Sequence, residues 1–103
     1  MKAKLILRAD DGIAREIDLP ALPVDIGRAP TASIRLGDRW LSRHHCRLEE
    51  ARGVLRVKDL GSRHGTFVNG RQIVECELQP GDHLRIGLTE FVAVYEEWPA
   101  SVQ

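Results

Sequence analysis

Arginine is the residue with the clearest chemistry in this 103-residue chain, and it is concentrated in the middle of the sequence. Residues 28–71 contain nine Arg and one Lys against four acidic residues, an excess of six positive charges in a chain whose formal net charge is zero. The planar guanidinium matches the oxygens of a phosphate or a carboxylate with two parallel hydrogen bonds. The charge pattern therefore predicts an anion-binding surface built from the central part of the chain.

Three polar segments separate the apolar runs of this region. They are Ile26-Gly27-Arg28, Leu41–His45 and the glycine-rich stretch Asp59–Gly70. Glycines permit positive φ and close backbone approach, and Ser, Thr and Asn side chains can bond to the backbone of their own loop. Because loops on a rigid sheet often carry function, the three segments are candidates for one binding surface. A cluster of well-made turns without a ligand is the alternative from these residues alone.

The elements that must position these segments read as short strands. Apolar and polar residues alternate with a period of two, turn residues separate the runs, and no long window shows a helical period. Strands are predicted at residues 4–8, 15–19, 24–27, 33–36, 45–48, 54–60, 76–78, 84–86 and 91–95. Many short strands with frequent turn signals predict an all-β sandwich or barrel.

Turn residues and alternation also predict how some strands pair. Asp10-Asp11-Gly12 predicts a hairpin between the first two strands, and Gly27 is expected to end the third. Strands 45–48 and 54–60 are expected to pair across the turn Ala51-Arg52-Gly53. The residues expected on the core face of this pair are Cys46, Leu48, Leu55 and Val57.

Several large side chains have no motif to place them. Trp40 either lines the binding surface or packs the base of its loop, and Trp98 is expected to cover an edge of the core. For most of the remaining central arginines, a solvated strand face is the better expectation. These are Arg35, Arg39, Arg47, Arg52, Arg56 and Arg71.

The length and the 43% hydrophobic content suit a single domain, predicted over residues 1–103 with a core from about residue 4 to 98. Cys46 and Cys76 lack the spacing of a redox or zinc motif, so buried free thiols are expected. The N-terminal apolar run is too short for a signal-peptide core, and no apolar stretch reaches the length of a membrane span. We therefore expect a cytoplasmic protein with reduced thiols. We also expect the protein to be a monomer.

The order and spacing of the three polar segments resemble the forkhead-associated (FHA) domain, a phosphothreonine-binding β-sandwich module. The resemblance covers about residues 4–98 and rests on Gly27-Arg28, on Ser-x-x-His at Ser42–His45, and on Asp-Leu-x-Ser-x-x-Gly-Thr-x-Val-Asn-Gly at Asp59–Gly70. It implies two twisted antiparallel sheets with about eleven short strands and the ligand loops at one end. It also implies recognition of phosphothreonine in a partner protein in Ser/Thr kinase signalling, without enzyme activity, metal or cofactor.

The resemblance assigns roles by position. The implied phosphate-binding residues are Arg28, Ser42 and Arg43. The implied peptide-binding residues are Arg63, His64 and Asn69, and the implied structural residues are Gly27, His45, Gly65 and Thr66. A guanidinium, a hydroxyl and backbone N–H groups can satisfy the phosphate oxygens without a metal.

His64 departs from the commonest pattern of this family, in which an Asn precedes the Gly-Thr pair and holds the main chain of the peptide. An imidazole lacks the paired carbonyl and amide groups of Asn. The sequence therefore predicts a less complete main-chain anchor at this position.

Two other kinds of site can be assembled from the same residues. A hydrolase would combine Ser42, Asp59 and one of His44, His45 and His64, but no nucleophile-elbow motif is present. A zinc site would use Cys46, Cys76, His64 and either His44 or His45, but no paired ligand spacing occurs. Both are weaker predictions than a phosphate-binding module.

Two further binding functions remain as alternatives. The excess of six positive charges would attract nucleic acid or another polyanion, although aromatic residues are sparse and no nucleic-acid-binding motif is present. The same fold could instead bind a protein partner without phosphate. The presence of both Arg28 and Ser42 argues against that reading.

Overall fold

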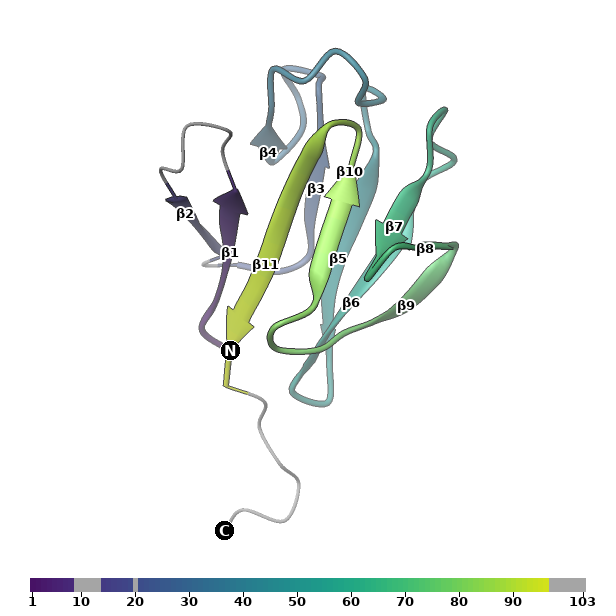
Figure 1. Ribbon diagram of the computed structural model, residues 1–103. Helices are drawn as coiled ribbons and strands as arrows, with labels where there is room; N and C mark the ends of the chain where they lie inside the picture. Colours follow the sequence, from purple (N-terminus) through teal and green to yellow (C-terminus); the bar gives the residue numbers. More distant parts are fainter. Residues whose placement is uncertain (9–13, 20, 97–103) are drawn as a thin grey trace, which may run out of the picture.

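The structure is a computed structural model that describes residues 1–8, 14–19 and 21–96. Within these residues eleven strands form two facing sheets (Figure 1). The all-β prediction from alternation is confirmed, and so are the two sheets and eleven strands that the family resemblance implies. The turn predicted at 10–12 and Trp98 lie outside the described residues.

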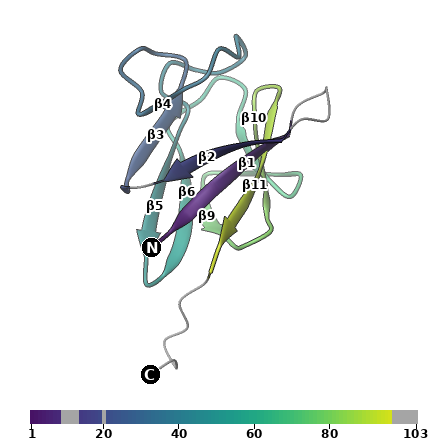
Figure 2. The same cartoon turned by 90° about the vertical axis from the view of Figure 1, so that its left-hand side faces the viewer.

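One sheet has six strands and the other has five. The first has the order β2-β1-β11-β10-β7-β8, and the second has the order β4-β3-β5-β6-β9. In chain order the strands are β1 (Ala3–Arg8), β2 (Ala14–Leu19), β3 (Val24–Gly27), β4 (Ile34–Arg35), β5 (Cys46–Ala51), β6 (Val54–Asp59), β7 (Thr66–Val68), β8 (Arg71–Ile73), β9 (Glu75–Leu78), β10 (His83–Ile86) and β11 (Thr89–Tyr95). Figure 2 shows the two layers from the side.

The prediction of a sandwich of two antiparallel sheets is confirmed, with the exception of one parallel pair of strands in the five-stranded sheet. The six-stranded sheet is antiparallel throughout, but β4 runs parallel to β3, with Ile26 opposite Ile34. The chain turns after β3, where the Ala32 N–H donates to the Ala29 carbonyl at 3.0 Å, and then returns in the same direction. Alternation shows which residues face the core, but it does not show the direction of the neighbouring strand.

Alternating residues from both sheets meet in a single core. Cys46, Leu48, Leu55 and Val57 have no exposed surface, which confirms the predicted core face of the β5–β6 pair. Phe91 in β11 is the largest fully buried side chain opposite them. Full burial of such side chains contributes about 1.5–3 kcal/mol each to folding.

The short hairpin formed by β7 and β8 is not among the predicted strands. Asn69 (φ 51°) and Gly70 (φ 83°) both have positive φ and form its two-residue turn. Asn-Gly is a strong signal for such a turn, because both residues tolerate left-handed backbone. The flanking strands have only three residues each, so their alternation is too short to recognise.

The loops that carry the polar segments gather at one end of the sandwich. Figure 1 shows the β3–β4, β4–β5, β6–β7 and β10–β11 connections at the top, and the N-terminus and the β5–β6 turn at the bottom. Among the described residues there is no helix with the length and apolar character needed to cross a membrane.

Candidate functional site

Backbone contacts join the end of β3 to the loop between β4 and β5. A Cβ atom on Gly27 would lie 2.0 Å from the carbonyl oxygen of Arg43, so only glycine permits this approach. One residue later, the Arg28 N–H donates to the Ser42 carbonyl at 3.1 Å. Gly27 therefore places Arg28 beside Ser42.

His45 braces two loops from a fully buried position. Its Nδ1 accepts a hydrogen bond from the Ser42 N–H at 3.1 Å, so Nε2 is the donor, and it lies 2.8 Å from the Gly65 carbonyl oxygen. The backbone of His45 also bonds to Ile26 and to Leu60, each at 2.9 Å. These contacts fit the predicted structural role, because both ring nitrogens are used in holding backbone groups.

A second network, centred on Asp59, shapes the loop between β6 and β7. The carboxylate accepts from the hydroxyls of Ser62 and Thr66, the latter at 2.7 Å, and from the N–H groups of Gly61 and Ser62 at 3.0 Å. The Ser62 oxygen in turn accepts from the Gly65 N–H at 3.0 Å. Burial raises the pKa of Asp59, but these hydrogen bonds outweigh it and leave the pKa below its ordinary value.

Ser42 and Arg28 present donors at the loop end of the sandwich. The Ser42 Oγ accepts from the Arg63 N–H at 2.9 Å, and its own hydrogen has no acceptor among the described residues. The Arg28 Nε donates to the Leu41 carbonyl at 3.3 Å, which holds the guanidinium in place. Its terminal NH₂ groups have no acceptor in the described part of the chain. Both side chains are thus fixed on one side and free to donate on the other.

These loops line a cleft of about 410 Å³. Its lining residues are Arg28, Arg39, Trp40, Leu41, Ser42, Arg43, His44, Arg63 and His64. None of them is a carboxylate, and none of the four arginines forms an ion pair with any described residue. The cleft is therefore electropositive and unneutralised.

Other central arginines differ from those of the cleft. Arg47 donates to Asp25 at 2.7 Å, and this hydrogen bond lowers the pKa of the Asp25 carboxyl although burial opposes it. Arg56 lies 3.5 Å from Glu75. Both were expected on solvated strand faces, and the structure adds a partner on a neighbouring strand.

Asp38 supports the loop that carries Ser42, although no sequence motif points to it. Its carboxylate accepts from the Trp40 N–H at 2.8 Å, the Leu88 N–H at 2.7 Å and the Thr89 hydroxyl at 2.8 Å. Burial raises the pKa of Asp38, but these hydrogen bonds leave it lowered. Leu88 belongs to the β10–β11 connection and Thr89 is the first residue of β11, so one carboxylate joins the two sheets at the loop end.

Trp40 and His64 connect the two loops that border the cleft. Their rings meet edge to face, with centroids 4.9 Å apart and an angle of 68° between the planes. Trp40 keeps 42% of its surface exposed and lines the cleft, so of its two predicted positions the structure shows the one on the surface.

Asn69 lies apart from the other predicted site residues. Its amide nitrogen donates to Asp82 at 3.0 Å, and its amide oxygen accepts from the His83 N–H at 2.9 Å. These bonds hold the β7–β8 turn against the start of β10, and Asn69 does not line the cleft. A ligand contact by Asn69 stays a prediction, whereas its described contacts are structural. Arg63 and His64 do line the cleft.

The described contacts do not assemble a hydrolase or zinc site. The Ser42 Oγ bonds to a backbone N–H, and the described partners of the Asp59 carboxylate are Gly61, Ser62 and Thr66, with no histidine among them. No three His, Cys, Asp or Glu side chains converge on a metal position in the described residues. Cys46 is fully buried, and burial raises the pKa of its thiol to about 12, whereas Cys76 is half-buried.

The profile of the FHA domain family matches residues 24–87, which include all three polar segments. The chain belongs to this family. FhaA of Mycobacterium tuberculosis is 36% identical over 86 residues, which cover 84% of this chain and 16% of FhaA. An FHA structure solved in a study of phosphothreonine-dependent FHA domain interactions superposes with a TM-score of 0.83 at 33% identity, covering 95% of this chain and 100% of that chain. The structure of the FhaA FHA domain complexed with the intracellular domain of Rv3910 superposes with a TM-score of 0.78 at 35% identity. The superposition covers 88% of this chain and 98% of that chain.

These curated relatives are longer than this FHA domain. The chain spans 16% of FhaA. This chain is also 36% identical to the glycogen accumulation regulator GarA of Mycolicibacterium smegmatis. The matched residues cover 73% of this chain and 46% of GarA. The likeness therefore concerns the FHA domain and not the remainder of these proteins.

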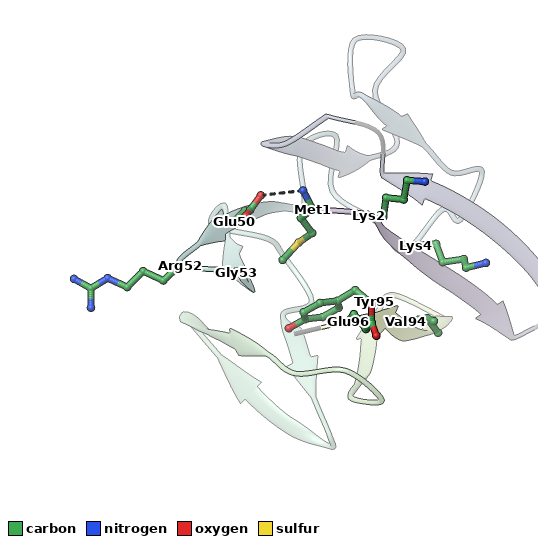
Figure 3. Close-up of a pocket in the computed structure, with 9 residues that line it drawn as sticks. All are labelled: Met1, Lys2, Lys4, Glu50, Arg52, Gly53, Val94, Tyr95 and Glu96. Atoms are coloured by element: carbon green, nitrogen blue, oxygen red, sulfur yellow. Dashed lines mark ion pairs between the residues drawn. The ribbon is translucent and has the colours of Figure 1, made fainter. Parts of the chain in front are cut away.

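A larger hollow, of about 1040 Å³, lies beside the N-terminus and the β5–β6 turn (Figure 3), at the end of this FHA domain away from the loops that line the cleft (Figure 1). Its lining residues are Met1, Lys2, Lys4, Glu50, Arg52, Gly53, Val94, Tyr95 and Glu96. The α-amino group of Met1 lies 4.0 Å from Glu50, and Arg52 extends away from the hollow. Charges of both signs occur here, and no set of donors converges on one point.

Proposed function

We propose that this FHA domain binds phosphothreonine in a partner protein and thereby makes a protein interaction depend on a Ser/Thr kinase. The observation that carries the proposal is the pairing of Arg28 and Ser42, which are joined by a backbone hydrogen bond of 3.1 Å and keep free donors. A phosphate group carries a charge of about −1.5 to −2 and three strong acceptor oxygens. It needs donors and positive charge, which these two side chains supply.

The remaining cleft residues have supporting roles in this proposal. Arg43 adds a second guanidinium beside Ser42, and Arg63 and His64 contact the peptide on either side of the phosphothreonine. The preference for threonine is supported by the similar FHA structure solved in a study of phosphothreonine-dependent interactions. We propose no catalytic role, because the Ser42 Oγ bonds to a backbone N–H and the His45 ring bonds to the Ser42 backbone rather than to its hydroxyl.

The free thiols of Cys46 and Cys76 support action in a reducing compartment such as the cytoplasm. A monomeric state stays a prediction from the sequence. Nucleic acid is the second candidate ligand, because the cleft contains four unpaired arginines. It is less well supported, because the cleft offers only one exposed Trp on which a base could stack.

The proposal is tested by measuring the affinity of the purified domain for phosphothreonine peptides and for their unphosphorylated forms. Charge-assisted hydrogen bonds contribute about 1.5–3 kcal/mol each, so Arg28→Ala should weaken phosphopeptide binding about ten- to a hundredfold. Arg28→Lys should restore only part of this loss, because an ammonium cannot form the two parallel bonds of a guanidinium.

Two controls make the result specific. Arg71→Ala removes an exposed arginine of β8 that does not line the cleft, and it should leave the affinity unchanged. A single-stranded oligonucleotide should compete poorly with the phosphopeptide. Equal affinity of wild type and Arg28→Ala for a bound phosphopeptide would contradict the proposal, and tighter binding of the oligonucleotide would favour the polyanion alternative.

A further inference from the structure

Arg28 and Ser42 both depend on a short turn that begins at Asp38. The Leu41 N–H donates to the Asp38 carbonyl at 3.0 Å, and the Leu41 side chain is buried in the core. The Leu41 carbonyl in turn accepts from the Arg28 Nε at 3.3 Å. Ser42 is the next residue, and its carbonyl accepts from the Arg28 N–H at 3.1 Å. The position of this turn therefore sets the positions of both proposed phosphate-binding side chains.

The Asp38 carboxylate fixes this turn to the other sheet. One oxygen accepts from the Trp40 N–H at 2.8 Å, within the turn. The other oxygen accepts from the Leu88 N–H at 2.7 Å and from the Thr89 hydroxyl at 2.8 Å. Hydrogen bonds to an ionised acceptor are stronger than those between neutral groups. Two of the three bonds therefore tie the turn to the β10–β11 connection and to the start of β11.

Gly87 allows the β10–β11 connection to approach the carboxylate closely. Its φ is 58°, in the left-handed region that favours glycine, and a Cβ atom there would lie 2.7 Å from the Asp38 Oδ2. A side chain at this position would therefore displace the carboxylate. Burial raises the pKa of Asp38, but the three hydrogen bonds leave it below its ordinary value, so the carboxylate is ionised at neutral pH.

We propose that Asp38 is a positioning residue for phosphate binding and that Thr89 acts on the cleft through it. This inference rests on the proposed function, in which Arg28 and Ser42 bind the phosphate. Neither Asp38 nor Thr89 lines the cleft, so their effect on affinity is indirect. Donors that are fixed in advance lose little conformational freedom when a ligand binds, and a loosened turn gives up this advantage. The six-stranded sheet thus controls the affinity of a site whose phosphate-binding residues belong to loops of the five-stranded sheet.

The first test is Asp38→Asn, for which positioning and charge predict changes of opposite sign. Removal of a negative charge near an arginine-rich cleft would by itself favour an anionic ligand. Whichever way the Asn amide is turned, however, the N–H of either Trp40 or Leu88 meets an NH₂ group in place of an oxygen. We therefore expect Asp38→Asn to weaken the binding of a phosphothreonine peptide about three- to tenfold, measured by fluorescence anisotropy.

Thr89 provides a milder test from the opposite sheet. Thr89→Val removes the hydroxyl that donates to Asp38 and should weaken the same peptide about two- to fivefold, whereas Thr89→Ser keeps a hydroxyl and should stay within about twofold of wild type. The matched control is Glu90→Gln, one residue further along β11. Its carboxylate contacts His83 and Arg8 outside the cleft, so this loss of a negative charge should leave the affinity within about twofold.

The outcomes separate this inference from the function on which it rests. Urea unfolding of each variant shows that it is folded where affinity is measured. If wild type binds the phosphopeptide and a folded Asp38→Asn or Thr89→Val protein binds it at least as tightly, the positioning role is excluded and phosphothreonine recognition stands. Equal losses in Thr89→Val and Thr89→Ser would also exclude it, because the hydroxyl would not be the cause. If wild type fails to bind every phosphothreonine peptide, the proposed function itself is overturned.

Discussion

The hollows at the two ends of the sandwich differ in size and in chemistry, and the proposed binding site is the smaller one. The end near the N-terminus has a hollow of about 1040 Å³, against about 410 Å³ for the cleft between the loops. The larger one contains Lys2, Lys4 and Arg52 together with Glu50 and Glu96, so its charges are mixed. The cleft contains four arginines and no carboxylate.

Unpaired donors, and not volume, are therefore the reason for proposing the site at the cleft. At the cleft, Gly27, His45 and Asp59 use their contacts to hold backbone, and the outward groups of Arg28 and Ser42 are left free. A ligand therefore meets donors that are already positioned and loses little conformational freedom in binding them. At the opposite end, Figure 3 shows no such convergence of side chains.

The largest effect is expected where the cleft depends on a close backbone contact. Gly27→Ala would place a Cβ atom 2.0 Å from the Arg43 carbonyl oxygen, so the two segments must separate. We expect a loss of about 3 kcal/mol in the free energy of unfolding and the loss of phosphopeptide binding. Gly37→Ala is the matched control, because a Cβ atom there meets nothing within 4 Å. Urea unfolding and peptide titration of both variants test this, and a stable Gly27→Ala protein with wild-type affinity would contradict it.

The next effect concerns acid sensitivity of the loop network. Because the folded-state pKa of Asp59 is lowered, its stabilising contribution is complete above the unfolded pKa of about 4 and is lost as pH falls through the folded value. Asp59→Asn should cost about 2 kcal/mol near pH 7 and should flatten the decline of stability in acid. The control Asp18→Asn, at an exposed position of β2, should change neither the stability near pH 7 nor the decline of stability in acid.

Unfolding free energies measured from pH 7 to pH 2 check this prediction. Asp25, Asp38 and Glu90 also have lowered pKa values, so a shallower decline should remain in Asp59→Asn. If the unfolding free energy of Asp59→Asn declined between pH 7 and pH 2 as steeply as that of wild type, the Asp59 hydrogen bonds would contribute little to stability.

A smaller effect is expected at the peptide side of the cleft. One neutral hydrogen bond contributes about 0.5–1.5 kcal/mol, so His64→Ala should weaken phosphopeptide binding about two- to tenfold. His64→Asn should keep or improve binding, because an amide can both donate to and accept from one peptide unit. If His64 only shapes the loop with Trp40, both variants should lose melting temperature without a selective loss of affinity. Unchanged affinity in a stably folded His64→Ala protein would exclude the anchoring role.

The smallest effect is expected at the opposite end. Arg52→Gln removes one positive charge there, and Figure 3 shows its side chain extending away from the body of the domain. Exposed charges are screened beyond about 8 Å at physiological ionic strength, so the phosphopeptide affinity should change less than about twofold. Surface plasmon resonance at two salt concentrations tests this. A loss comparable to that of Arg28→Ala would show that the two ends do not act separately.

The sequence by itself determined the strand pattern and the order of the polar segments. Alternation placed Cys46, Leu48, Leu55 and Val57 on the core face, and all four are fully buried. The information is local, since each strand shows which residues face inward through its own period of two. The motifs likewise marked Gly27 and Ser42–His45 as candidates for one surface, because their residue types are unusual between strands.

Only the tertiary structure decided which side chains have partners. Asp38 bonds to Leu88, fifty positions along the chain. Arg47 is neutralised by Asp25 of the neighbouring strand, while Arg39 has no partner among the described residues. Strand direction, as in the parallel β3–β4 pair, and the structural use of Asn69 were decided in the same way. Hydrogen bonds and ion pairs act over a few ångströms, so they depend on which distant segments the fold brings together.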